Sequence, residues 1–280
     1  MSKSKASQKP EFTPQNFTAS FELYPLIAMV RENALHLAQS LSGHSEWTDI
    51  HMSDEEWVFT RRQPRQGQPG GAVKVTVKED EVEIEHRFPT GALERFEILV
   101  DQVTDAVQQV AKPQVLLGTN VSLEYLVALG GDARTSILGG LKLLDDEDQS
   151  DKLAVFQRPC QFVGLRLGFP AYRPLPREAD NATDDENGGP SEKVADTPGE
   201  SHAEPSPANE GTGEDWQATL TIQSVPDEPN QLSVEVHGRW MMASRWEDVG
   251  PIMVARVRTV DRFLRTKISA FLKHFREDEP

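Results

Sequence analysis

Hydrophobic and polar residues alternate most clearly between residues 73 and 88. Three valines alternate with polar residues on the first arm, and Val82 and Ile84 alternate with glutamates on the second. An alternation of period two sends successive side chains to opposite faces of a strand. The pattern therefore predicts an antiparallel hairpin with one apolar and one polar face, and it places His86 on the apolar face.

Apolar residues at steps of three and four predict two long helices, one after each predicted hairpin. The first begins at Leu93, and the second covers residues 247–275. Pro25 and Asp132 indicate the starts of two further helices, because proline fits the first helical turn and aspartate accepts hydrogen bonds from free backbone N–H groups. Strands are predicted at 17–23, 56–62, 114–126, 161–169, 216–224 and 232–240.

The stretch from Val82 to Phe88 is echoed by the stretch from Val234 to Trp240. Each has valine, glutamate and a β-branched residue, then histidine, arginine and an aromatic residue, with one position of slippage. A weaker echo relates the segment at Ser20 to the segment at Ser122. Internal repeats organise a whole fold, but strands and helices also alternate by chance in many α+β proteins.

The repeat interpretation predicts an α+β fold built from two β-α-β-β-β-α halves, residues 15–112 and 113–276. Each half has an antiparallel sheet, and we expect helices to cover one face of it. Residues 1–14 are polar and rich in lysine and serine, which predicts a disordered tail.

The negative charge of the chain is concentrated in one segment. The formal net charge is −16 over 280 residues, and residues 178–215 contain twelve acidic residues and one lysine. Residues 174–215 contain no aromatic residue, and such a segment cannot bury enough apolar surface to offset its ordering entropy. This composition predicts a disordered acidic insertion within the second half.

The last predicted helix carries basic residues that form a candidate anion-binding surface. They are Arg256, Arg258, Arg262, Arg265 and Lys267. The acidic insertion could cover this helix and compete with an anionic ligand or a nucleic acid, a contact that salt would weaken. The alternative is that the insertion is only a solvated loop.

The two hairpin arms supply a second candidate site, a cleft lined by His86, Arg87, His237 and Arg239. If the halves face each other, the histidines could share this cleft, and one could serve as an acid–base group. The alternative is that each histidine lies half-buried on its strand and packs against a helix.

Other chemistry is not indicated. The single cysteine, Cys160, excludes an intrachain disulfide and a multi-cysteine metal site. Motifs typical of phosphate binding and hydrolysis are absent from the sequence. The cluster His44, Glu46, Asp49, His51, Asp54, Glu55 and Glu56 has a spacing that matches no known metal site, so neither a metal nor a cofactor is expected. No run of 18 apolar residues predicts a membrane helix, and the N-terminus lacks a signal-peptide pattern, so we expect a cytoplasmic protein.

The strand from Val115 to Tyr125 and the ending Phe271-Leu272-Lys273-His274-Phe275 resemble an uncharacterised, sporadically distributed bacterial protein family. In that family a strand in the middle of the chain ends in an aromatic residue, and a long C-terminal helix closes on phenylalanine. The resemblance spans residues 16–276 loosely, and Leu126-Val127-Ala128 stand where an Asn-Arg pair is expected. The family has no established activity, so the resemblance implies no catalytic residues.

These patterns favour a non-enzymatic binding or interaction protein, whose partner is an unidentified protein or small molecule. The absence of a recognisable catalytic constellation supports this interpretation. Two alternatives stay open: anion or nucleic-acid binding by the last helix, gated by the acidic insertion, and an enzyme with a cleft between the halves.

Overall fold

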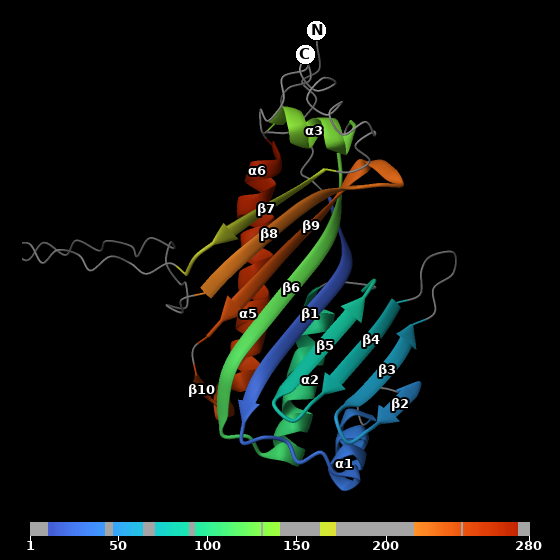
Figure 1. Ribbon diagram of the computed structural model, residues 1–280, viewed down its shortest axis with the longest axis vertical. Coiled ribbons are helices and arrows are strands. Elements are labelled where there is room, and N and C mark those ends of the chain that lie inside the picture. The colour runs from blue at the N-terminus through green and yellow to red at the C-terminus, as the bar shows by residue number, and fades with distance from the viewer. Residues whose placement is uncertain are drawn as a thin grey trace, which may run out of the picture.

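The computed structural model describes residues 11–42, 47–63, 71–89, 93–129, 131–140, 163–171, 216–241 and 243–273. They form a mixed α/β structure in which ten strands make one antiparallel sheet (Figure 1). The order of strands in this sheet is β2-β3-β4-β5-β1-β6-β9-β8-β7, with β10 paired to β6. The strands are β1 (Phe12–Tyr24), β2 (Asp49–Met52), β3 (Trp57–Gln63), β4 (Gly71–Val77), β5 (Glu81–Arg87), β6 (Val115–Ala128), β7 (Gly164–Phe169), β8 (Trp216–Val225), β9 (Glu228–Trp240) and β10 (Ser244–Arg245).

The two long strands at the centre, β1 and β6, join the regions that the sequence assigned to separate sheets. Their ladder runs from the pair Phe12–Val127 to the pair Tyr24–Val115. Because β1 pairs with β5 on its other edge and β6 with β9, both central strands have neighbours on each side. The expectation of one sheet per half is therefore wrong, because the strands of both predicted halves belong to one continuous sheet.

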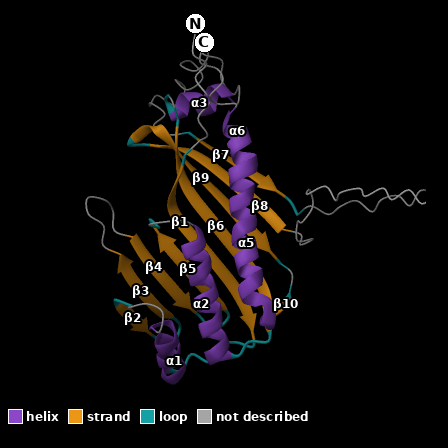
Figure 2. Ribbon diagram, turned by 180° about the vertical axis from the view of Figure 1, so that it is seen from behind, coloured by secondary structure: helices purple, strands orange, loops and turns teal. Residues whose placement is uncertain are grey.

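Helices lie on one face of this sheet, as Figure 2 shows from behind. The helices are α1 (Arg31–Ser42), α2 (Leu93–Ala111), α3 (Ala133–Gly140), α5 (Val249–Phe263) and α6 (Ser269–Lys273), with a 3-10 turn at Trp246–Asp248 and a π-helical turn at Leu264–Ile268. Helices α1, α2, α5 and α6 cover the sheet, whereas α3 lies at one end of it (Figures 1 and 2).

The covered face is apolar because every second residue of each central strand points into it. Phe17 and Phe21 of β1 and Val234 and Val236 of β9 are fully buried in one core, which α2 and α5 complete. Burial of a side chain of this size stabilises the fold by about 1.5 to 3 kcal/mol. The sequence prediction of an antiparallel, helix-covered sheet rests on this alternation, and the structure confirms it.

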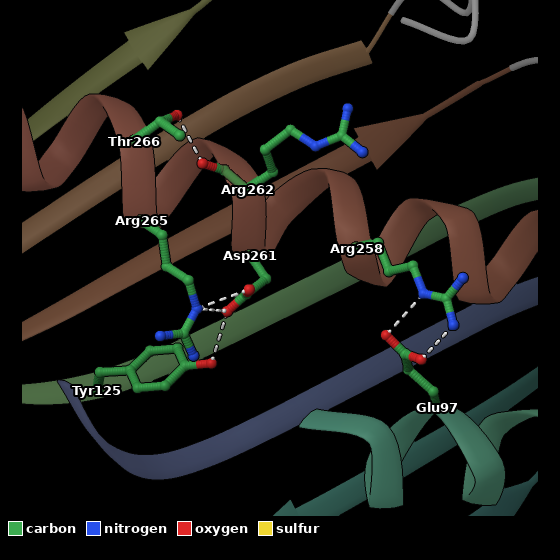
Figure 3. A network of polar contacts seen from close by, with 7 residues as sticks. All are labelled: Glu97, Tyr125, Arg258, Asp261, Arg262, Arg265 and Thr266. Atoms are coloured by element: carbon green, nitrogen blue, oxygen red, sulfur yellow. Dashed lines mark hydrogen bonds and ion pairs between the residues drawn. The ribbon is translucent and has the colours of Figure 1, made fainter. Parts of the chain in front are cut away.

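The helices α2 and α5 contact each other at a glycine. A Cβ atom built on Gly250 would lie 2.7 Å from Oδ1 of the exposed Asp101, so the two helices approach each other closely at this position. Farther along α5, Arg258 donates two hydrogen bonds to the carboxylate of Glu97 on α2, from Nε at 3.0 Å and from Nη2 at 2.7 Å (Figure 3). A forked pair of this geometry fixes one helix relative to the other.

Several boundaries differ from the sequence predictions. Strand β1 begins at Phe12, inside the predicted tail, because Phe12 packs edge-on against Tyr125, 5.8 Å between ring centroids. Helix α1 begins at Arg31 and not at Pro25, since the intervening chain bonds the β4–β5 turn through the Ile27 N–H and the Glu79 carbonyl. An additional strand, β2, occupies part of the expected connection before β3.

Some predictions fall outside the described residues. They concern the acidic insertion 174–215, the first ten residues, Cys160, two members of the His/Asp/Glu cluster (His44 and Glu46), and the C-terminal His274 and Phe275.

Candidate binding site on the open face of the sheet

The four residues of the predicted cleft do not come together, because β5 and β9 direct their histidines to opposite faces. His86 shares the helix-covered face with Val82 and Ile84, is 4% exposed, and its ring lies 6.5 Å from that of Phe96. His237 lies on the other face, together with Arg239. The slippage of one position in the sequence echo has this effect, since a shift of one residue moves a side chain to the other face of a strand.

We call the face opposite the helices the open face. Among the described residues, no helix lies on it (Figures 1 and 2). It carries the polar side chains of the alternating strands, and it is indented at the centre by an open hollow of about 370 Å³. The residues that line the hollow are Thr18, Ser20, Glu83, Asn120, Ser122, His237 and Arg239.

The lining residues come from four adjacent strands and stand in two rows across them. The first row is Glu83, Ser20, Asn120 and Arg239, because each is the direct cross-strand partner of the next. The second row contains Thr18, Ser122 and His237. Direct partners in antiparallel strands have Cβ atoms about 5 Å apart, so each row is a continuous line of polar groups.

The floor of the hollow is made of neutral side chains that hydrogen bonds hold in place. The Asn120 side-chain amide donates to the Ser20 hydroxyl at 3.2 Å, and the Ser122 hydroxyl donates to Glu235 at 2.6 Å. Because the Ser122 hydroxyl donates its hydrogen bond to a carboxylate and not to the neighbouring His237, these residues do not form the bonded nucleophile and base of a covalent catalyst.

The two ends of the first row carry opposite charges. Glu83 stands at one end and the exposed Arg239 at the other, and neither has an ion-pair partner within the described part of the chain. Arg87, the arginine of the corresponding arm, differs in this respect, since it bonds Glu85 at 2.6 Å. In β9 the position of that glutamate is taken by His237.

Burial lowers the pKa of His237 below its ordinary value of 6.5. The positive charges of Arg239 and Arg166 act in the same direction, whereas Glu235 opposes them. Position 237 is therefore neutral at pH 7 and does not replace the negative charge that Glu85 provides to Arg87.

The structure divides the predicted anion-binding surface of the last helix. Arg256 is 2% exposed, donates to the Thr119 hydroxyl at 2.6 Å, and lies over the ring of Trp240. Arg258 pairs with Glu97, and Arg265 with Asp261 at 2.8 Å (Figure 3). Only two of the five residues, Arg262 and Lys267, are exposed without an ion-pair partner in the described ranges.

Asp261 also ties the last helix to the central strand β6. It accepts a hydrogen bond from the hydroxyl of the buried Tyr125 at 3.0 Å, beside the Arg265 guanidinium (Figure 3). Burial and the charge of Asp261 raise the pKa of Tyr125 far above its ordinary value. This cluster is a structural attachment, because its phenol is enclosed between the sheet and the helix.

Sequence reasoning missed five of the seven lining residues. Each of them, Thr18 for example, alternates with buried apolar residues and so could be assigned to the polar face of a strand. The burial of Arg256 also had a signal, since it lies three residues after Met253 and four before Val260, on the apolar stripe. No sequence signal places residues 20, 83, 120 and 239 side by side.

The described residues contain no group of three or more His, Cys, Asp or Glu side chains that could hold a metal ion. None of their helices has the length and apolar character needed to cross a membrane.

No protein-family model and no curated protein matches the chain. Among solved structures, the chain is similar to the di-domain ARO/CYC StfQ from the steffimycin biosynthetic pathway, at 9% sequence identity over 93% of this chain and 96% of that chain. The TM-score is 0.21, a likeness that carries no argument about this chain.

Proposed function

We propose that this chain is a binding protein that holds a polar ligand in the hollow on the open face. The observation that carries the proposal is the pair of charged side chains, Glu83 and Arg239, at opposite ends of a polar row. A charged group without a partner is poised to bind a complementary group, because a charge-assisted hydrogen bond is stronger than a neutral one.

Two alternatives have less support. An enzyme with a cleft between the halves would need His86 and His237 in one cleft, and they lie on opposite faces. Anion or nucleic-acid binding by the last helix retains only Arg262 and Lys267, which is few for a surface that neutralises several phosphates.

We also propose that the two halves are related by duplication. When Val82 is aligned with Val234, Glu85 corresponds to His237. Their direct partners on the central strands are Thr18 and Ser122, which both line the hollow. The stronger sequence echo and the pairing register therefore agree, whereas the weaker echo of Ser20 with Ser122 is two residues out of step with them.

Native mass spectrometry of the full chain, purified without denaturant, tests the binding proposal. The variant Ser122→Tyr fills the hollow with a side chain that strands accommodate well. The matched control is Thr60→Tyr, which adds the same side chain to the open face on β3, away from the hollow.

We expect a non-covalent ligand to co-purify with the wild-type protein and with Thr60→Tyr, and to be lost from Ser122→Tyr. A wild-type protein without any adduct, or an adduct that Ser122→Tyr keeps, would overturn the proposal. Far-UV circular dichroism and thermal unfolding establish that both variants are folded.

A further inference from the structure

We infer, resting on the proposed function, that the ligand of the hollow is dipolar. It carries an ammonium group that meets Glu83 and a carboxylate that meets Arg239. The shared chemistry is that of a short peptide with free termini or of an ω-amino acid.

The separation of the two charges sets the length of the ligand. Glu83 and Arg239 are separated by the two central strands, so three inter-strand spacings, about 14 Å, lie between their backbones. A charge-assisted contact at each end takes up roughly 3 Å. Because side chains on strands stand roughly perpendicular to the sheet, the two charges keep about the separation of their backbones. The ammonium and carboxylate of the ligand should therefore stand on the order of 8 Å apart, the span of two to three extended peptide residues.

The floor of the hollow favours a peptide over a plain ω-amino acid. Between the two charges the ligand lies over the Ser20 hydroxyl and the Asn120 amide, with Thr18 and Ser122 in the adjoining row. A hydroxyl and an amide have more donor and acceptor positions than their mutual bonds use. These positions can bond the N–H and C=O groups of a peptide, which an alkyl chain lacks.

Nearby carboxylates do not remove the need for an anion at Arg239. Glu124 and Glu235 lie two rows from Arg239, beyond the row of His237. Each accepts a hydrogen bond from a serine, Ser233 at 2.8 Å and Ser122 at 2.6 Å. Neither carboxylate lines the hollow, and within the described ranges neither pairs with an arginine. The hollow itself has the volume of a small-ligand site, about 370 Å³.

The probe is triglycine in four forms: with both termini free, N-acetylated, amidated, and blocked at both ends. Dissociation constants are measured at pH 7 by NMR titration of the full chain. We expect triglycine with free termini to bind at least tenfold more tightly than either singly blocked form, because each blocked form loses one charge-assisted contact. A further measurement uses 6-aminohexanoate, which has a similar charge spacing and no internal amide. It should bind more weakly than triglycine, because its alkyl chain cannot bond the Ser20 hydroxyl or the Asn120 amide.

Two variants assign the ends of the ligand. Glu83→Gln should abolish the difference between the free and the acetylated amine, and Arg239→Gln the difference between the free and the amidated carboxyl. Arg166→Gln on the same face, outside the hollow, is the control and should preserve both differences. Equal affinity of all four forms, no binding of any form, or discrimination that survives in the matched variant would each overturn the inference.

Failure of this inference can be told from failure of the proposed function. If Ser122→Tyr loses a co-purified ligand but the protein does not discriminate among the triglycine forms, the hollow binds a ligand that is not dipolar. If Ser122→Tyr loses nothing, the binding site itself is wrong.

Discussion

Strands β5 and β9 contain a stretch of similar residues, and the differences within it change both faces of the sheet. Each is the second arm of a hairpin and lies beside a central strand, β5 beside β1 and β9 beside β6. The sequence Val-Glu-Ile-Glu-His-Arg-Phe of one arm corresponds to Val-Glu-Val-His-Gly-Arg-Trp in the other. Two of the four differences are conservative, Ile84 for Val236 and Phe88 for Trp240. The other two fall on adjacent positions, and because adjacent residues alternate, one of them lies on each face.

On the helix-covered face, His86 in β5 corresponds to Gly238 in β9. A Cβ atom at Gly238 would lie 2.9 Å from both Trp240 and Val260 and 3.0 Å from Trp216. The glycine makes room for the stacked rings of Trp216 and Trp240, 5.2 Å apart, beneath α5. The same slot in β5 holds an imidazole beside Phe96 and α2.

On the open face, Glu85 corresponds to His237. Glu85 neutralises Arg87, whereas the neutral His237 leaves Arg239 available. The comparison teaches that a strand can keep its fold-defining residues while one exchange removes the ion pair of its arginine.

The largest effect on stability is expected from replacing Gly238 on the helix-covered face. Gly238→Ala should lower the free energy of unfolding by about 3 kcal/mol, the upper end for an overpacked core, because its neighbours are two indole rings and a core valine. Urea unfolding measures the loss. The control Gly168→Ala has no atom within 4 Å of the added Cβ and should be nearly neutral; equal losses in the two variants would contradict the packing argument.

The next effect concerns the buried arginine above Trp240. Arg256→Lys should cost about 2 kcal/mol, since lysine keeps the charge but loses the planar contact with the ring and the fixed bond to Thr119. Arg262→Lys on the exposed side of the same helix is the matched control and should leave urea unfolding unchanged. If Arg256→Lys leaves the free energy of unfolding unchanged, the planar guanidinium is not needed at this position.

A functional effect follows from making β9 resemble β5. His237→Glu should pair with Arg239 as Glu85 pairs with Arg87, and triglycine affinity should then fall about tenfold, or 1.4 kcal/mol. NMR titration measures the affinity. The isosteric comparison is His237→Gln, which brings no charge and should retain most of the affinity; a glutamate variant that binds as well as the glutamine variant would refute the role of a free Arg239.

The smallest effect is on the pH dependence of stability. Because the pKa of His237 is lowered in the folded chain, the unfolded chain binds this proton more readily, and stability falls as the pH drops from 7 through the unfolded value of 6.5 and toward the folded pKa. His237→Gln should lack this part of the decline. Urea unfolding of both proteins between pH 8 and 5 tests it, and parallel curves would contradict the shift.

Much of the fold could be predicted from local pattern. The alternation of residues 73–88 and the apolar stripe of the last helix predicted the hairpin and the helix correctly. Both periods can be recognised within a short window of sequence. The pairing of β1 with β6 could not be predicted, since its partners are about a hundred positions apart and either strand has an equally apolar face.

The site was less predictable for the same reason. Arg239 and His237 were identified as candidates, but Glu83 and the hydroxyls beside it are ordinary polar residues until four strands bring them into one row. The predicted equivalence of His86 and His237 was wrong. The two histidines are shifted by one residue relative to each other, and a shift of one residue places them on opposite faces of the sheet.

A crystal structure of the full chain grown with saturating triglycine tests the central claim most directly. The account predicts that the peptide lies across β5, β1, β6 and β9, with its ammonium at Glu83 and its carboxylate at Arg239. An empty hollow at saturation, or a peptide bound elsewhere or in the opposite direction, would contradict it.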